Sequence, residues 1–119
     1  MTDNKVNYLI LGIENQSEIH YAMPVKDMLY DAEQYTKQVL FNAKKHRRDK
    51  THNKGITSGE FLSGFYKDDK LVPVITIVVF WSADEWDGPK DLHSMMETKD
   101  INILKYVPNY KINLISPYN

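Results

Sequence analysis

A long series of apolar residues at spacings of three and four is the feature that most constrains the fold of this chain. The series covers residues 24–48 and begins at Pro24, a residue well suited to the first turn of a helix. Its members are Val25, Met28, Leu29, Ala32, Tyr35, Val39, Leu40 and Ala43. This spacing predicts one amphipathic helix of about seven turns. The opposite stripe of that helix holds Lys26, Tyr30, Glu33 and Lys37.

Apolar segments on both sides of this helix are predicted to be strands. Residues 6–13 form a short apolar run, in which Gly12 indicates either a bend or the close approach of another backbone. Residues 71–81 are almost continuously apolar and rich in Val and Ile, which is typical of a strand covered on both faces. Residues 112–116 predict a closing strand.

Short helices are predicted between the last two strands. Asp87-Gly88-Pro89 indicates a turn that starts a helix ending near Glu97, and Asp100 is a candidate cap for a helix over residues 101–105. Residues 49–59 are predicted to be a loop, and residues 60–66 fit either a helical turn or a short strand. The resulting β-α-β-α-β order predicts a single α/β domain over residues 1–119, built as a sandwich.

Composition excludes several classes of protein and site. The 119 residues include no Cys, which rules out a disulfide scaffold, a Cys zinc site and a thiol nucleophile. No apolar run approaches the roughly 20 residues needed to cross a bilayer. The first residues are polar and lack a signal-peptide core. We therefore expect a cytoplasmic protein with no membrane partner.

Charge is distributed unevenly along the chain. The formal net charge is −1, but residues 37–54 carry seven basic residues against Asp49 alone, which gives +6 there and −7 over the rest. The basic members are Lys37, Lys44, Lys45, Arg47, Arg48, Lys50 and Lys54. Such a patch can neutralise phosphates, which makes these residues candidates for nucleic-acid binding. The alternative is a solvated helix end, where cations favour the negative pole of the helix dipole.

Glu14 and Gln16 are candidate residues of a metal or phosphate site at the first predicted strand. They stand at its carboxyl end, and because side chains alternate along a strand, both point to the same face. A carboxylate there can bind a hard divalent cation, and an amide can orient water or hold a phosphate oxygen. The alternative is an ordinary polar strand end.

Residues 10–32, from Ile10-Leu11-Gly12-Ile13-Glu14-Asn15-Gln16 to Tyr30-Asp31-Ala32, closely resemble a bacterial protein family. The family is the PD-(D/E)XK nuclease family transposases, also called Rpn-type recombination-promoting nucleases. Further matching segments lie at residues 60–64, 71–81, 85–89 with 92–93, and 105–108 with 110–117. The resemblance covers almost the whole chain.

The resemblance implies a restriction-endonuclease-like fold and metal-dependent cleavage of DNA. Glu14 matches the family's metal-binding Glu and would hold Mg²⁺, while Gln16 stands where a Lys is usual. Lys26 and Tyr30 match positions that the family tends to fill with a basic residue and a Tyr. Being one turn apart, they can reach the same phosphate, and Lys26 can supply the charge that Gln16 lacks. The alternative for this pair is a solvated helix face.

The family's first metal-binding Asp has no match in this chain. Asp3 is the only upstream acid, and eleven extended residues would place it about 30 Å from Glu14. The family's N-terminal helix and first strands have no match either, so the chain resembles a version truncated at the N-terminus. We therefore expect a degenerate or partial DNA nuclease of the transposase type, inactive as an isolated chain and dependent on Mg²⁺ for any activity.

A strand that lacks its family neighbour exposes an edge that can pair with another chain, so we expect a homodimer or a complex with a partner. The expected partners are DNA or a protein complex that handles nucleic acid. The alternative function is a non-catalytic binding protein: an inhibitor or regulator of a nucleic-acid enzyme, such as an anti-defence factor of a phage or mobile element. A remnant that still folds but has no function is a third possibility.

Overall fold

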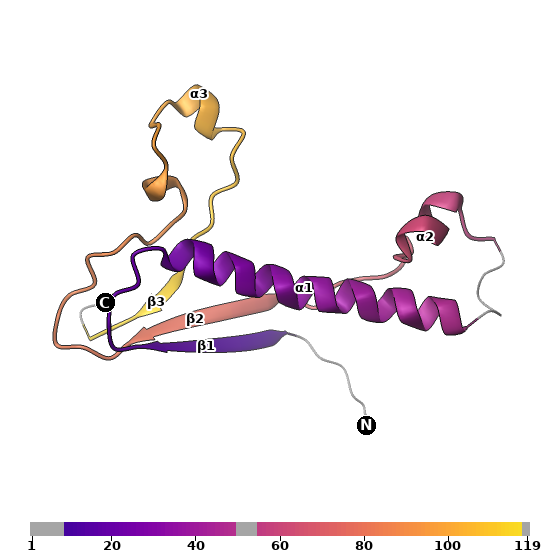
Figure 1. The fold of residues 1–119 in the computed structure, drawn as a ribbon, viewed down its shortest axis with the longest axis horizontal. Coiled ribbons are helices and arrows are strands. Elements are labelled where there is room, and N and C mark those ends of the chain that lie inside the picture. The colour runs from indigo at the N-terminus through magenta and orange to yellow at the C-terminus, as the bar shows by residue number, and fades with distance from the viewer. Residues whose placement is uncertain (1–8, 50–54, 118–119) are drawn as a thin grey trace. The chain divides into compact units, whose positions relative to one another are not determined.

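The computed structural model describes residues 9–49 and 55–117. Its elements are β1 (Ile10–Gln16), α1 (Met23–Arg48), α2 (Ser58–Ser63), β2 (Val74–Phe80), the 3₁₀ helix η2 (His93–Met95), α3 (Ile101–Leu104) and β3 (Asn113–Ile115) (Figure 1). The prediction of a mixed α/β fold is confirmed.

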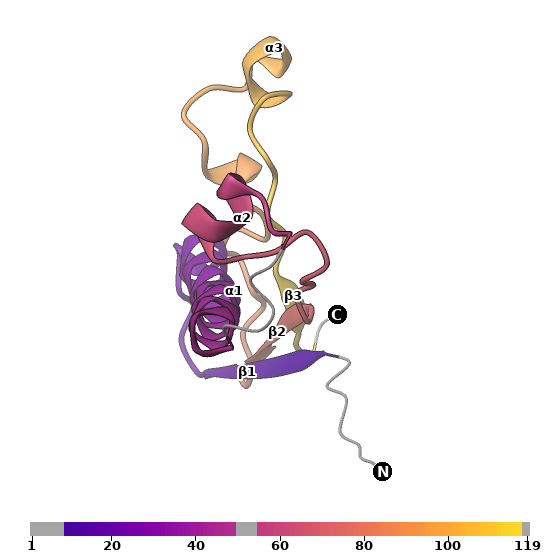
Figure 2. The same ribbon diagram turned by 90° about the vertical axis from the view of Figure 1, so that its right-hand side faces the viewer.

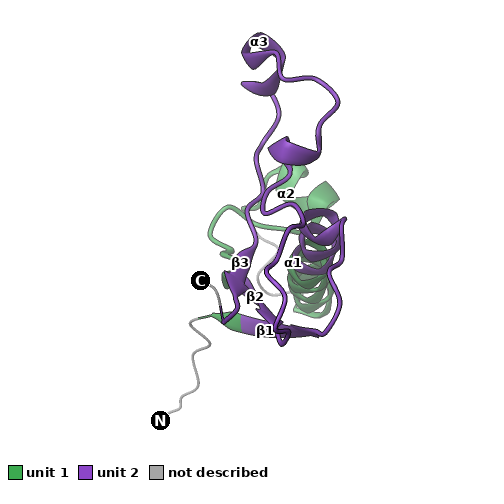
Figure 3. Cartoon of the chain, turned by 90° about the vertical axis from the view of Figure 1, so that its left-hand side faces the viewer, with its two compact units in different colours: residues 1–10, 32–74 green, residues 11–31, 75–119 purple. Residues whose placement is uncertain are grey.

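The chain divides into two compact units, coloured separately in Figure 3. Within the described ranges, unit 1 comprises residues 9–10 and 32–74, and unit 2 comprises residues 11–31 and 75–117. Helix α1 contributes its first turns to unit 2 and the rest to unit 1. The single domain expected from the order of the elements stays a prediction.

The three strands form one sheet in the order β1-β2-β3. β2 and β3 are parallel, with Ile77 opposite Asn113 and Val79 opposite Ile115. β1 runs in the same direction as β2, because the N–H of Ile10 donates to the Pro73 oxygen at 2.8 Å at one end. At the other end, the N–H of Trp81 donates to the Gln16 oxygen at 3.0 Å. The first strand therefore ends three residues later than the pattern predicts, and its predicted start at residues 6–8 lies outside the described residues.

β2 is buried on one face only, so the prediction of a strand covered on both faces is wrong. Val74, Thr76, Val78 and Phe80 are buried, whereas the alternate residues Ile75, Ile77 and Val79 are exposed or half-buried. An unbroken apolar run does not show whether both faces are covered, because one-sided burial can go with apolar residues on the other face as well.

The apolar core of unit 2 lies on the buried face of the sheet. Met23 at the start of α1 packs there with Val78, Phe80 and Trp86. The rings of Phe80 and Trp86 meet edge to face, with centroids 5.2 Å apart, a favourable geometry for aromatic pairs. Ile19, Ile112 and Leu114 pack against the rim of this core.

Helix α1 forms where the spacing predicts it, but it buries only part of the predicted stripe: Ala43 is buried and Met28, Tyr35 and Val39 are half-buried. Val25, Leu29 and Leu40 of that stripe are 41%, 60% and 57% exposed, whereas Asp27 and Asp31 are buried. Asp31 can be buried because the hydroxyl of Thr76, which is distant in sequence, donates a hydrogen bond to its carboxylate. None of the helices in the described part of the chain has the length and apolar character that a bilayer crossing would need.

In unit 1, polar side chains of α1 form hydrogen bonds with the backbone of the segment that leads into β2. The side-chain amide of Gln38 donates to the Val72 oxygen at 3.0 Å and accepts from the Val72 N–H at 2.7 Å, in place of a neighbouring strand. The Tyr35 hydroxyl accepts from the N–H of Val74 at 2.9 Å. These bonds satisfy backbone groups that would otherwise be buried without a partner.

The last turns of α1 are held by aromatic and ionic contacts within unit 1. The His46 ring stacks on Tyr66, with centroids 3.6 Å apart, and its Nε2 lies 2.7 Å from Oδ2 of Asp69. Burial works to raise the pKa of Asp69, but hydrogen bonds from the Tyr66 N–H and from His46 outweigh it and lower that pKa. His46 therefore has a packing role.

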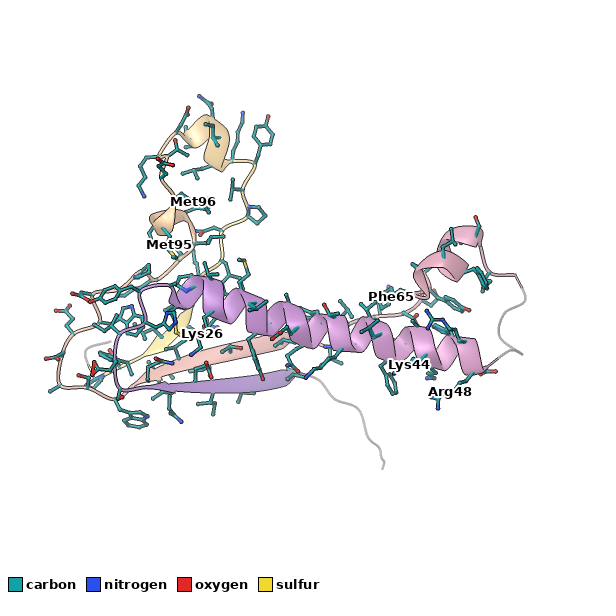
Figure 4. The ribbon with its side chains drawn as sticks, viewed as in Figure 1. Lys26, Lys44, Arg48, Phe65, Met95 and Met96 are labelled. Carbon is teal, nitrogen blue, oxygen red and sulfur yellow. The ribbon has the colours of Figure 1, made fainter. Side chains whose placement is uncertain are left out.

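Local capping signals explain two of the short helices, α2 and α3. Residues 58–63 are helical because Thr57 and Glu60 form a reciprocal capping box, and Asp100 caps α3 by accepting from the Asn102 N–H at 2.9 Å. The prediction of a helix over residues 89–97 is wrong. Asp91 instead bridges to Lys111 in an antiparallel pair, which leaves only the turn His93–Met95 (Figure 4).

Candidate functional site

Glu14 and Lys26 form an ion pair between β1 and the first turns of α1. The Lys26 Nζ lies 3.1 Å from the Glu14 Oε1, and the two side chains are about one-third to two-fifths exposed. Figure 4 labels Lys26 near the start of the helix. Glu14 and Gln16 both lie on the half-buried face of β1, as the alternation predicts. The structure therefore brings together Glu14 and Lys26 of the predicted site, and both are engaged with each other.

The Tyr30 ring lies against the same strand at Gly12, which is two residues before Glu14. A Cβ added to Gly12 would stand 3.0 Å from the Tyr30 Cε2 and 3.2 Å from the Thr76 Oγ1, so the ring fits only because residue 12 has no side chain. Gly12 was expected to permit either a bend or a close approach by another backbone. The approaching group is a side chain instead, and Tyr30 has a packing contact here.

Two acidic residues that the sequence reasoning missed lie on the buried face of α1. Asp27 is 1% exposed, and neither of its carboxylate oxygens has a hydrogen-bond partner. Asp31, one turn later, accepts from the Thr76 hydroxyl at 2.6 Å and from the Tyr110 hydroxyl. Their four-residue spacing was the available signal, but the partners of Asp31 lie 45 and 79 residues away and leave no local trace.

The environment of Asp27 favours its protonated form. Burial raises the pKa of the Asp27 carboxyl to about 6, and the nearby charges of Asp31 and Glu14 act in the same direction. The Lys26 ammonium opposes this shift but does not cancel it. The raised pKa means that a proton competes more strongly for the Asp27 oxygens than for those of an ordinary Asp, and metal ligands must be deprotonated.

The carboxylates around Glu14 do not fit a magnesium site. Mg²⁺ takes ionised oxygen ligands in near-octahedral geometry, whereas the Glu14 carboxylate is paired with Lys26 and the pKa of Asp27 is raised. Within residues 9–49 and 55–117, no three His, Cys, Asp or Glu side chains are placed to hold a metal ion. Asp3, the only upstream acid, lies outside the described residues.

The basic residues of the predicted nucleic-acid patch lie along the second half of α1. Lys37, Lys44, Lys45, Arg47 and Arg48 are all exposed, and Lys50 and Lys54 lie outside the described residues. Figure 4 shows Lys44 and Arg48 projecting from the same side of the helix. Residues 37, 41, 44 and 48 share one helix face, because they are three or four positions apart.

Phe41 lies in the middle of this face and is 63% exposed. We call Lys37, Phe41, Lys44 and Arg48 the basic stripe. On one side of Phe41 is a hollow of about 450 Å³ that Lys44, Arg47 and Arg48 also line. On the other is a hollow of about 490 Å³, whose lining includes Gln34, Lys37 and Lys70. An exposed aromatic ring thus stands between two cationic hollows, a combination that the charge count alone did not reveal.

Comparison with known proteins identifies no relative of this chain: no protein-family model, curated protein or solved structure matches it.

Proposed function

We propose that this chain is a nuclease-like protein without nuclease activity that binds single-stranded nucleic acid through the basic stripe. The observation that carries the proposal is the exposed ring of Phe41 between Lys37 and the cations Lys44 and Arg48 on one helix face. The restriction-endonuclease-like core is part of the proposal. It is supported by the parallel strands and by Glu14 and Gln16 on the helix-facing side of β1.

The chemistry of the stripe matches a single strand better than a duplex. Exposed aromatic rings bind unpaired bases by stacking, and neighbouring cations neutralise the phosphates on either side. In a duplex the base faces are already stacked, so the Phe41 ring has no base face to bind. The chain carries no net positive charge, so binding must be local to this stripe.

The pairing of Glu14 with Lys26 supports the absence of cleavage. A metal-dependent nuclease needs its carboxylates free to hold the cation that stabilises the developing charge on the phosphate. Here a lysine ammonium already lies 3.1 Å from the carboxylate. This pairing supports a non-catalytic protein over the degenerate enzyme; the role of inhibitor or regulator of a nucleic-acid enzyme stays a prediction.

The test is a titration of a fluorescently labelled single-stranded oligonucleotide, followed by anisotropy and then by a denaturing gel of the same samples with Mg²⁺ present. We expect saturable binding that weakens with salt, and an intact oligonucleotide on the gel. The absence of binding at low salt would refute the proposal. Cleavage that disappears in Glu14→Ala would refute its non-catalytic part.

A further inference from the structure

The face of the sheet that turns away from α1 is apolar and exposed. On the helix side lie Gly12, which the Tyr30 ring approaches, and Thr76, which binds Asp31. Alternation therefore places the odd-numbered residues of β1 and β2 on the opposite side. There the Trp81 indole N–H donates to Oδ1 of Asn15 at 3.0 Å. Figure 2, which views the structure from its end, shows the first turns of α1 on one side of the strands.

We call this surface the open face, and all of it belongs to unit 2. Its apolar members are Leu11, Ile13, Ile75, Ile77, Val79, Trp81 and Ile115. Ile13 is 59% exposed and Trp81 is 68% exposed. The strand residues of the open face include no charged side chain, and its polar members are the amides Asn15 and Asn113.

The open face is as large as the largest apolar patches that monomers leave in water. Its exposed apolar area is on the order of 600 Å², at the upper limit of the largest patches found on monomers. Two such faces packed together would bury about 1,200 Å², which reaches the range of specific protein interfaces. An uncharged face offers nothing to attract a charged partner. Sheets can pack directly on one another, with their side chains interdigitating about 10 Å apart.

We propose that a second copy of this chain covers the open face, so that two sheets pack face to face across a two-fold axis. Such an interface is isologous, since the same residues meet from both copies. Trp81 is its aromatic anchor, because the hydrogen bond to Asn15 fixes the orientation of the indole ring before association. None of its residues belongs to the basic stripe, so the proposed dimer does not require nucleic-acid binding.

Sedimentation equilibrium of the full chain tests the proposal. We expect wild type to reach about twice 13.9 kDa at micromolar concentration. Ile13→Lys, which puts a charge in the middle of the open face, should be a folded monomer. The matched control is Ile101→Lys on α3, because Ile101 is 77% exposed and lies off this face. This control should stay dimeric.

Iodide quenching of tryptophan fluorescence provides a second readout that needs no variant. Trp81 is exposed in one copy whereas Trp86 is buried, so dilution of a dimer should increase the quenched fraction. A wild type that is monomeric at all concentrations, with quenching independent of dilution, would overturn the proposal. A dimer that survives Ile13→Lys would overturn it too, because association would then use the β1 edge or another surface.

Discussion

The ammonium of Lys26 lies 3.1 Å from the carboxylate of Glu14, the residue that the sequence resemblance predicts to bind a metal ion. The pair joins the first turns of α1 to the end of β1. A partly exposed ion pair of this kind contributes little to stability, about 0–1 kcal/mol, so its main consequence is chemical. It compensates the charge of the one carboxylate that the resemblance assigns to metal binding.

We expect neither metal binding nor cleavage at Glu14. Millimolar MgCl₂ or MnCl₂ should leave the melting temperature of the chain unchanged, because the described residues include no group of three His, Cys, Asp or Glu side chains placed to hold a metal ion. Plasmid DNA should stay intact. Differential scanning calorimetry and agarose gels measure the two effects. A metal-dependent rise in melting temperature that is lost in Glu14→Ala would contradict this prediction.

Asp27→Asn should stabilise the chain at neutral pH. The pKa of Asp27 rises from 3.8 to about 6 on folding, so between these values the folded chain holds a proton that the unfolded chain releases. The free energy of unfolding should therefore fall as pH rises across this window, and then stay constant above it. The variant should lose this fall and gain up to about 3 kcal/mol at pH 7.5.

Urea denaturation at a series of pH values measures the effect of Asp27→Asn. The matched control is Asp84→Asn, which removes the same charge from an exposed loop position and should keep the wild-type pH profile. Equal pH profiles for wild type and Asp27→Asn would show that Asp27 is ionised at no cost, against the burial described here.

The position of α1 on the sheet is the part of the fold that local patterns could not supply. The periodicity of residues 24–48 predicted the helix itself, since apolar spacing is a local property. Which face is buried depends on contacts across the chain: Tyr30 against Gly12, and Asp31 with Thr76. These contacts override the apolar stripe and leave Leu29 in water.

The candidate site shows the same division between local and distant information. Glu14, Gln16 and Lys26 were named from their sequence positions, and the common face of Glu14 and Gln16 follows from strand alternation. The ion pair of Glu14 with Lys26 was not predicted, because it requires the register of helix against strand. Phe41 was missed because it falls between the predicted apolar stripe and the basic residues.

Gly12→Ala should destabilise the chain by about 1–3 kcal/mol, because the added methyl group meets the Tyr30 ring and the Thr76 hydroxyl at 3.0–3.2 Å. In a Tyr30→Ala background the same change should cost clearly less. Chemical denaturation of the four proteins in this double-mutant cycle measures the coupling. Gly59→Ala is the control and should be near neutral, because its Cβ would meet only the Thr57 Oγ1, at 3.9 Å. Additive effects at Gly12 and Tyr30 would contradict the described contact.

Lys44→Glu combined with Arg48→Glu should weaken binding of a single-stranded oligonucleotide by at least about tenfold and reduce its dependence on salt. The matched control combines Lys90→Glu with Lys99→Glu, which changes the net charge equally in exposed positions of unit 2. The measurement is fluorescence anisotropy at two or more salt concentrations. Equal losses in both double variants would mean that overall charge, rather than the basic stripe, governs binding.

The most direct test of the proposed function is the affinity of Phe41→Ala for a labelled single strand of about 15 nucleotides, compared with a duplex of the same sequence. The control is Leu62→Ala, since Leu62 is 80% exposed and lies on α2. We predict a loss of about tenfold for the single strand, or about 1.4 kcal/mol, with little change for the duplex and none for Leu62→Ala. Unchanged single-strand affinity in Phe41→Ala would contradict the account.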